Sequence, residues 1–495
     1  MSDLIFNEED IKQIKARGST LKGVISQMET FKNGIPFIKL ERPCTIGDGI
    51  TVLEKENLQK LTETYLEAAS SGRVMKFIPA SGASSRMFKL LHYFNNRYEK
   101  IDMKRIIAKA KKGDPDYEAF YRFSSEIRKL PFYDDLKSIL SESGLDIEAL
   151  ISGGQFKEIL ENILTSKGLN YADSPKGLVK FHQYTDDRSR TPIEEHLVAA
   201  GLYKQDRNRV SRVHFTVSHT HLESIKKHTG RFVSGSDNSV VRYEITFSTQ
   251  KPSTDTIAVD LDNKPLRDNK GRLIFRPGGH GALLENLNDL KGDIVFIKNV
   301  DNVVPDRLKH EVKVYTKAIG GYLINIQKVL FAYLEMLAGG NFDVKLLKEM
   351  FEFARHTLSI IPPEGVKRWS KDEKANFLFS RFNRPIRVCG MVKNEGEYGG
   401  APFWVRQKDN TLSLQIVESS QVDMESEKQR AVWESATHFN PVDLACGVRD
   451  YLGKPFNLLD FRDPDTGFIS IKSQDGMELK ALEMPGLWNG GMAEW

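Results

Sequence analysis

The sequence has few cysteines and no targeting segment. Three cysteines occur in 495 residues, at positions 44, 389 and 446, and no two of them form a C-x-x-C pair. This spacing argues against a disulfide scaffold and a cysteine zinc site, and it is typical of a reducing compartment. The first fifteen residues mix acidic and apolar side chains, without the basic and apolar regions of a signal peptide. We therefore expect a cytoplasmic protein.

Long apolar runs and an excess of one charge are also missing. The longest apolar stretches, such as Val329–Leu334, are far shorter than the roughly 20 residues that a membrane-spanning helix needs. Lys and Arg number 71 against 67 Asp and Glu, and the basic residues are scattered. Sequence-independent nucleic-acid binding requires a concentrated basic surface. We therefore expect no membrane or nucleic-acid partner, and composition alone does not separate an enzyme from a binding protein.

Short apolar runs of strand type alternate with helix-like segments along the middle of the chain. Val74–Ala80, Val213–Ser218 and Ile294–Asn299 are such runs. Repeated βα units of this kind predict an α/β fold with a mixed, mostly parallel sheet covered by helices. Ligands of such sheets bind at the carboxyl ends of the strands.

The same patterns predict how the chain is organised. Apolar residues at three- and four-residue spacing predict helices in several segments, and β-type segments dominate the last hundred residues. We expect one large unit with the following parts: a helical lead-in at 1–72, an α/β core at 73–310 with a helical insertion at 91–172, a helical segment at 311–385, and a β-rich completion at 386–495.

A loop of small residues follows the first predicted strand. Its residues are Ser81, Gly82, Ala83, Ser84 and Ser85, and an arginine and an apolar helix come next. A strand, a small-residue loop and a helix in this order can bind phosphate, because backbone N–H groups approach the anion and the helix N-terminus favours negative charge. The loop matches neither common phosphate-loop motif, so taken alone an ordinary strand–helix turn is an equal alternative.

Three later segments favour the phosphate-binding alternative. Ser174–Leu178 holds a lysine between a proline and a glycine, and Arg276–Ala282 contains three glycines within four positions. Close glycines allow the backbone to approach a flat or anionic group. Asp301 follows a buried strand, where a carboxylate can hold a divalent cation beside phosphates. Together these residues are what an enzyme needs to handle a nucleoside triphosphate.

At these positions the sequence resembles the eukaryotic-type UTP–sugar-1-phosphate uridylyltransferases, or UDP-sugar pyrophosphorylases. The most specific match is Pro277–Gly281 (PGGHG) followed by Asn299–Asn302 (NVDN). Further matches are Arg387–Met391, Val417-Glu418 and Thr437–Asn440, which are similar to the sugar-facing strands of those enzymes. The resemblance implies the nucleotidyltransferase fold that is shared with GT-A glycosyltransferases. The chain as a whole also resembles an uncharacterised bacterial family of unknown function.

The resemblance implies roles at the phosphate end of the substrate. The loop 81–85 would cradle the triphosphate, and Arg86 would lie toward the pyrophosphate leaving group. Lys176 matches the lysine of the P-K-G motif and would neutralise phosphate charge. Asp301 would bind Mg²⁺, the cofactor that the resemblance implies.

The resemblance also implies contacts with the uridine and the sugar. Gly279, His280 and Gly281 would flank the uridine, and Glu418 and Asn440 would face the sugar hydroxyls. The sequence departs from the family at Ser81 and Ala83, where glycine is usual, and at Ala282, where the P-G-H-G enzymes usually carry an acidic residue.

The implied reaction joins a nucleoside triphosphate, UTP by the resemblance, to a sugar-1-phosphate and releases pyrophosphate. Such a transfer depends on positioning and charge stabilisation more than on a side-chain nucleophile. Two alternatives stay open. One is a glycosyltransferase that uses nucleotide sugars on the same fold, although the single Asp301, without a D-x-D pair, weighs against it. The other is a non-catalytic nucleotide-binding or scaffold protein, which the altered loop favours. The sequence leaves the oligomeric state open.

Overall fold

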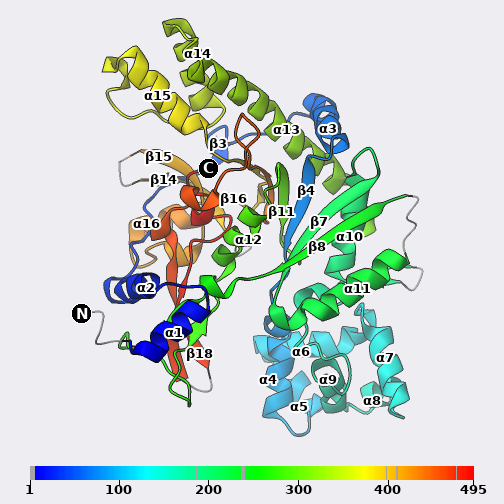
Figure 1. The fold of residues 1–495 in the computed structure, drawn as a ribbon. Helices are drawn as coiled ribbons and strands as arrows, with labels where there is room; N and C mark the ends of the chain where they lie inside the picture. Colours follow the sequence, from blue (N-terminus) through cyan, green and yellow to red (C-terminus); the bar gives the residue numbers. More distant parts are fainter. Residues whose placement is uncertain are drawn as a thin grey trace.

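A mixed sheet runs through the centre of the molecule. The computed structural model describes residues 6–185, 188–203, 205–235, 240–396, 399–407, 411–474 and 477–495. Within these residues the largest sheet has six strands in the order β12-β17-β11-β4-β7-β8. Figure 1 labels β11, β4, β7 and β8 in the central part of the molecule. The strands are β4 (Val74–Pro79), β7 (Val210–Val217), β8 (Arg242–Thr249), β11 (Ile294–Lys298), β12 (Ile386–Cys389) and β17 (Asp443–Gly447).

The directions of these strands bring several strand ends to one edge. Strands β11, β4, β7 and β8 run parallel, whereas β17 runs antiparallel to both β11 and β12. The carboxyl ends of the parallel strands therefore lie beside the end of β12 and the start of β17. We call this the carboxyl edge of the sheet. The predicted fold class, a mixed and mostly parallel sheet with helical insertions, is confirmed.

The central strands are covered on both faces. Every residue of β11 is buried, and β4 is buried except at one position. Such strands appear in the sequence as continuous apolar runs, which is why both were predicted. Helices α3 (Lys55–Ser70) and α13 (Asp306–Ala338) cover one face, and α12 (Leu283–Asp289) covers the other. A Cβ at Gly321 would lie 1.9 Å from the Leu61 carbonyl oxygen, so α13 requires glycine where it crosses α3.

Six helices between β4 and β7 form a small core of their own, at the lower right of Figure 1. Phe94, Phe120 and Leu136 are fully buried in it. The helices are α4 (Lys89–Arg97), α5 (Met103–Ala110), α6 (Pro115–Glu126), α7 (Tyr133–Glu142), α8 (Ile147–Ser152) and α9 (Phe156–Leu164). The chain then returns to the sheet through α10 (Pro192–Tyr203), and α11 (Leu222–Ser234) links β7 to β8.

The N-terminal helices pack on a sheet that the C-terminal strands complete. Helices α1 (Glu8–Ala16) and α2 (Leu21–Asn33) share a hydrophobic core with β9, β10, β18 and β19. These strands span Thr256–Val259, Phe275–Arg276, Phe468–Gln474 and Met477–Glu483. Residues near the two ends of the chain are therefore held in one layer (Figure 1).

A third sheet joins the lead-in to the late part of the chain. Strand β1 (Leu40–Pro43) pairs antiparallel with β14 (Ala401–Arg406), which pairs with β15 (Leu412–Val417). The helical pattern of residues 1–72 did not predict β1, because four residues are too few for a periodic signal. The remaining helices are α14 (Val344–His356), α15 (Lys371–Phe382) and α16 (Glu427–Glu434). The remaining strands are β2 (Thr45–Ile46), β3 (Gly49–Ile50), β5 (His182–Gln183), β6 (Ser189–Arg190), β13 (Val392–Lys393) and β16 (His438–Phe439).

No helix in the described ranges is both long and apolar enough to cross a membrane.

A histidine is buried in the middle of β7. The ring of His214 stacks on Phe77 with 5.6 Å between centroids, and its nitrogens lie 2.8 Å from the hydroxyls of Thr246 and Ser248. Burial lowers the pKa of His214 from 6.5 to about 4. Between these two pH values the unfolded chain binds a proton here that the folded chain does not. The free energy of unfolding therefore falls as the pH drops from 6.5 toward 4.

We expect His214→Gln to weaken this pH dependence. A difference of this size corresponds to about 3 kcal/mol over the whole interval. The glutamine stays neutral, so urea unfolding of the variant should lose less stability than the parent between pH 6.5 and pH 4. His356→Gln is the control, because His356 is 71% exposed on α14. If the free energy of unfolding changes with pH by the same amount in the parent and in His214→Gln, protonation of His214 is not the cause of the pH dependence.

Candidate active site

The loop after β4 lies at the carboxyl edge and is largely exposed. Within residues 81–86, Ser84 alone is buried. Its hydroxyl donates to the carbonyl oxygen of Ser174 at 2.6 Å, and its backbone N–H donates to the same oxygen at 3.1 Å. Ser84 therefore anchors the loop to the chain that returns from the helical insertion.

Several backbone donors of this loop are unused. The N–H groups of Gly82, Ala83 and Ser85 make no hydrogen bond within the part of the chain that the structure describes. The space beside Gly82 is open, since the nearest atom to a Cβ there would be Cδ of Lys176 at 3.9 Å. Arg86 is exposed and follows directly. Free N–H groups at a strand–helix junction, next to cationic side chains, suit an anion.

Lys176 and Asp301 form an ion pair across 125 residues of sequence. Nζ of Lys176 lies 2.7 Å from Oδ2 of Asp301. The backbone N–H of Lys176 donates to the carbonyl oxygen of Gly82 at 3.0 Å, which fixes the lysine to the loop after β4. The structure thus brings the loop, the lysine and the aspartate together. We call residues 81–86, Lys176 and Asp301 the β4–β11 site.

The glycine after Lys176, Gly177, allows Lys176 to approach Asp301. A Cβ at Gly177 would lie 2.9 Å from Cδ1 of Ile193 and 3.2 Å from Cγ2 of Val300. Val300 directly precedes Asp301, so a side chain at position 177 would push the lysine turn away from the aspartate. The P-K-G sequence therefore has a packing reason for its glycine.

Two residues from other elements hold the turn that carries Asp301. Nε2–H of His196 on α10 donates to the carbonyl oxygens of Asn299 and Val300 at 3.0 and 3.1 Å. Burial, together with the charge of the nearby Lys298, lowers the pKa of His196 well below its usual range, so its ring is neutral. On the other side, Nδ2 of Asn302 donates to the carbonyl oxygen of Pro441 at 2.6 Å. Sequence reasoning missed His196, because one buried histidine on a helix forms no pattern.

The second group of predicted residues centres on His280 and Glu418. Nδ1 of His280 accepts a hydrogen bond from the backbone N–H of Leu487, and its Nε2 lies 3.5 Å from Oε1 of Glu418. The imidazole stacks on Trp488 with 4.1 Å between centroids. Nδ2 of Asn489 donates to the same carboxylate oxygen at 2.9 Å. We call these residues, together with Gly279 and Gly281, the His280–Glu418 group.

The carboxylate in this group is already satisfied. Burial alone would raise the pKa of Glu418, but the hydrogen bond and charge of His280, with the bond from Asn489, outweigh it. The pKa of Glu418 therefore lies below its usual 4.5, and the group stays ionised against partners of its own chain.

The glycines beside His280 pack against the end of the chain. A Cβ at Gly281 would lie 2.2 Å from the carbonyl oxygen of Pro485, and one at Gly279 would lie 2.6 Å from Oε2 of Glu483. Gly279 also has a φ of 73°, which favours glycine. The three residues predicted to flank a uridine are thus in contact with residues 483–488.

Asn440 is buried and holds backbone. Its Nδ2 donates to the carbonyl oxygen of Gly390 at 2.7 Å, and its Oδ1 accepts from the N–H of Val442 at 2.9 Å. These bonds fix the chain after β12 beside the start of β17. Both polar atoms of the amide that was predicted to face sugar hydroxyls are engaged in this way.

The predicted residues therefore fall into three places. The β4–β11 site contains every residue predicted for the phosphates, the metal and the leaving group. The His280–Glu418 group contains the residues predicted for the uridine and one predicted for the sugar, and Asn440 lies apart from both. Within the described residues no hydrogen bond or ion pair links the β4–β11 site to the His280–Glu418 group.

Comparison with known proteins gave a family and distant structural likenesses. The family described as "Domain of unknown function (DUF4301)" matches residues 7–495. No curated protein matches the chain. Among solved structures, UDP-N-acetylglucosamine pyrophosphorylase from Trypanosoma brucei, in complex with an inhibitor, shares 11% identity at a TM-score of 0.41, over 95% of this chain and 65% of that one. The chain thus covers slightly less than two thirds of that protein.

Two further structures are similar at the same level. A mutant UDP-glucose pyrophosphorylase from Leishmania major, in complex with UDP-glucose, shares 10% identity at a TM-score of 0.40, over 98% of this chain and 72% of that one. A UDP-glucose phosphorylase from Trypanosoma brucei shares 12% identity at a TM-score of 0.40, over 96% and 70%. These values are too low to assign an activity, which has to be argued from the site.

We expect Gly281→Ala to destabilise the protein, because the new methyl group would overlap the carbonyl oxygen of Pro485. Overpacking of this kind costs about 1–3 kcal/mol. Gly230→Ala is the control, because Gly230 lies within α11 and has nothing within 4 Å of a Cβ. Alanine there should be neutral or slightly stabilising. Urea unfolding measures both variants, and equal stabilities would mean that residues 483–488 do not cover this turn.

Proposed function

We propose that this chain, which belongs to the DUF4301 family of unknown function, is a nucleotidyltransferase. It joins a nucleoside triphosphate to a sugar-1-phosphate and releases pyrophosphate. The observation that carries the proposal is the β4–β11 site, where free backbone N–H groups, Lys176 and Asp301 meet at the carboxyl edge of a largely parallel sheet. Phosphate-bearing ligands of such sheets bind at this edge.

The residues of the β4–β11 site suit an in-line transfer between phosphates. An oxygen of the sugar-1-phosphate attacks the α-phosphorus, and the bond from that phosphorus to the bridging oxygen breaks as pyrophosphate leaves with the electron pair. Lys176 and the N–H groups of the loop stabilise the charge that develops on the phosphate oxygens. Arg86, which is exposed at the far end of the loop, would bind the leaving pyrophosphate.

Asp301 suits Mg²⁺ as the cofactor of this reaction. Its Oδ2 accepts from Lys176, and its Oδ1 has no hydrogen bond within the described residues. No cluster of three or more His, Cys, Asp and Glu in those residues could hold a metal alone. Mg²⁺ is usually bound by one or two carboxylates plus substrate phosphates, which fits one aspartate and a triphosphate. When bound, the ion supplies charge neutralisation, and Asp301 would hold it beside the loop.

The preference for UTP rests on the sequence resemblance at Gly279, His280 and Gly281. In the structure these residues contact residues 483–488, so a base that stacks there would require that segment to move. The same contact favours a second candidate function, a protein that binds nucleotides without catalysis. Release of pyrophosphate separates the two, because a binding protein would bind the triphosphate and leave it intact.

We expect Lys176→Met and Asp301→Asn each to lower the rate of pyrophosphate release by at least about 100-fold, the loss typical for one charge-stabilising group. The assay combines the full chain with Mg²⁺, a nucleoside triphosphate and a panel of sugar-1-phosphates. No release from any combination with the parent protein would refute the catalytic proposal.

The chain offers a matched control for both variants. Lys180 and Asp135 also form an ion pair, at 2.6 Å, and the exposure of their side chains, 27% and 39%, nearly equals the 27% and 37% of Lys176 and Asp301. Lys180→Met and Asp135→Asn should therefore keep the parent rate. Equal losses in both pairs would point to a general loss of structure.

A further inference from the structure

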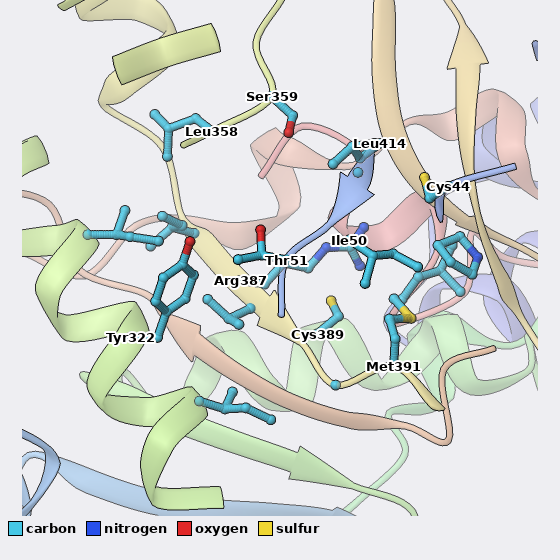
Figure 2. Close-up of a pocket in the computed structure, with 18 of the residues that line it drawn as sticks. Cys44, Ile50, Thr51, Tyr322, Leu358, Ser359, Arg387, Cys389, Met391 and Leu414 are labelled. Atoms are coloured by element: carbon cyan, nitrogen blue, oxygen red, sulfur yellow. The ribbon is translucent and has the colours of Figure 1, made fainter. Parts of the chain in front are cut away.

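A large cavity lies beside the carboxyl edge. It contains no residue of the β4–β11 site or of the His280–Glu418 group, although Arg387–Met391, which resembles a sugar-facing strand, is part of its wall. Its volume is about 780 Å³, within the range of about 300–1,000 Å³ that small-molecule sites occupy. It lies between α13, β12, the strands β14 and β15, and the segment 44–53 (Figure 2). Apolar side chains make up much of its wall: Ile50, Ile319, Leu358, Cys389, Met391 and Leu414.

Three hydroxyl groups face the cavity without partners. Thr51 follows β3, Tyr322 lies on α13, and Ser359 lies in the turn after α14. Figure 2 shows the three side chains around one space. None of the three hydroxyls has a hydrogen bond within the residues that the structure describes. Ser359 has a φ of 55°, an uncommon backbone conformation for a residue other than glycine, asparagine or aspartate. An apolar wall with a few convergent polar groups is typical of a ligand site.

Arg387 adds a positive charge that no carboxylate neutralises. Its Nη1 donates to the carbonyl oxygen of Trp488, and no acidic side chain in the described ranges pairs with it. The other two arginines of the wall differ, because Arg381 and Arg384 both contact the carboxylate of Glu494. Guanidinium groups bind carboxylates and phosphates with paired hydrogen bonds. The unpaired arginine therefore favours an anionic group on the occupant.

From this wall we infer that the cavity binds a small organic anion with an apolar body. The ring or chain of the ligand would lie on Ile319, Leu358 and Leu414, and its carboxylate or phosphate would contact Arg387. The inference does not depend on the nucleotidyltransferase proposal, because it uses none of the residues of the β4–β11 site.

The cavity nevertheless adjoins that site. Pro441 lines it, and the carbonyl oxygen of Pro441 accepts from Asn302, the residue after Asp301. Asp443, also in the wall, pairs with Lys298 at the end of β11 at 2.9 Å. An occupant would therefore lie one hydrogen-bonded contact from the turn that carries Asp301.

The test uses 8-anilinonaphthalene-1-sulfonate, which is an aromatic anion, and N-phenyl-1-naphthylamine, which has the same rings without the charge. Fluorescence titration of the full chain should show one saturable site for the anion, with a dissociation constant about tenfold lower than for the neutral compound. Arg387→Met should abolish this preference. Leu358→Trp should fill the cavity and raise the dissociation constants of both compounds at least tenfold.

Matched variants control for changes away from the cavity. Arg122→Met removes an exposed arginine of α6, and Leu66→Trp enlarges a side chain of α3 that is 44% exposed. Both should bind the two compounds as the parent does. A cooperative urea transition in every variant excludes probe binding to a partly unfolded chain.

Displacement separates the two chemical sources of the anion. Octanoate or octyl phosphate should compete with the bound probe, and the stronger competitor identifies a carboxylate or a phosphate ligand. The inference fails if the folded parent shows no saturable site, if Arg387→Met and Leu358→Trp bind like the controls, or if neither anion competes. Asp301→Asn should keep the probe site, so loss of pyrophosphate release and loss of this site are distinguishable.

Discussion

The parallel pairing of β4 with β11 determines where the candidate chemistry lies. The register sets Ile294 beside Val74 and Ile297 beside Phe77. Both strands then reach the carboxyl edge side by side, so the loop 81–86 and the turn that carries Asp301 are neighbours. A slip of one residue would move Phe77 or Ile297 from the face beneath α12 to the opposite face. Burial of these side chains therefore fixes the relative position of a lysine and an aspartate that contribute little to the core themselves.

Three basic residues, Lys76, His196 and Lys298, lie near the carboxyl edge of the sheet but contribute little net positive charge there. Burial lowers the pKa of Lys76 well below its usual range and so favours its uncharged form. His196 is neutral for the same reason, and Lys298 is paired with Asp443. Of the two cationic side chains at the loop after β4, Lys176 is paired with Asp301, and Arg86 has no carboxylate partner within the described residues. This arrangement lets buried groups hold the turn at 299–302 through hydrogen bonds without competing for an anion.

Local signals in the sequence predicted the local parts of this structure. The apolar runs of β4 and β11 and the small-residue loop were visible because each is a pattern within about ten residues. The contact of Gly281 with Pro485 was not, because glycine has the same sequence signature whether a ligand or another part of the chain approaches it. The resemblance marked Arg387–Met391 as one part of the cavity wall. The cavity itself was not predicted, since the rest of its wall, including Thr51 and Tyr322, comes from segments up to several hundred residues apart and follows no spacing rule.

The structure shows which predicted glycine is open to a ligand and which is already in contact with another part of the chain. The position beside Gly82 is open except for the flexible stem of Lys176 at 3.9 Å, whereas a Cβ at Gly281 would overlap a carbonyl oxygen at 2.2 Å. Close approach at Gly82 is therefore still available to a ligand, and close approach at Gly281 is already used by residues 483–488. No other part of the described chain would therefore block the phosphate binding proposed for Gly82. Contact of a base with His280 requires displacement of the C-terminal segment, which would give up the stacking on Trp488 and the hydrogen bond from Leu487. Under the proposed function, triphosphate binding can therefore precede contact with the base. The free energy of moving this segment would weaken the binding of every base alike, so a preference for one base would come from contacts that differ between bases.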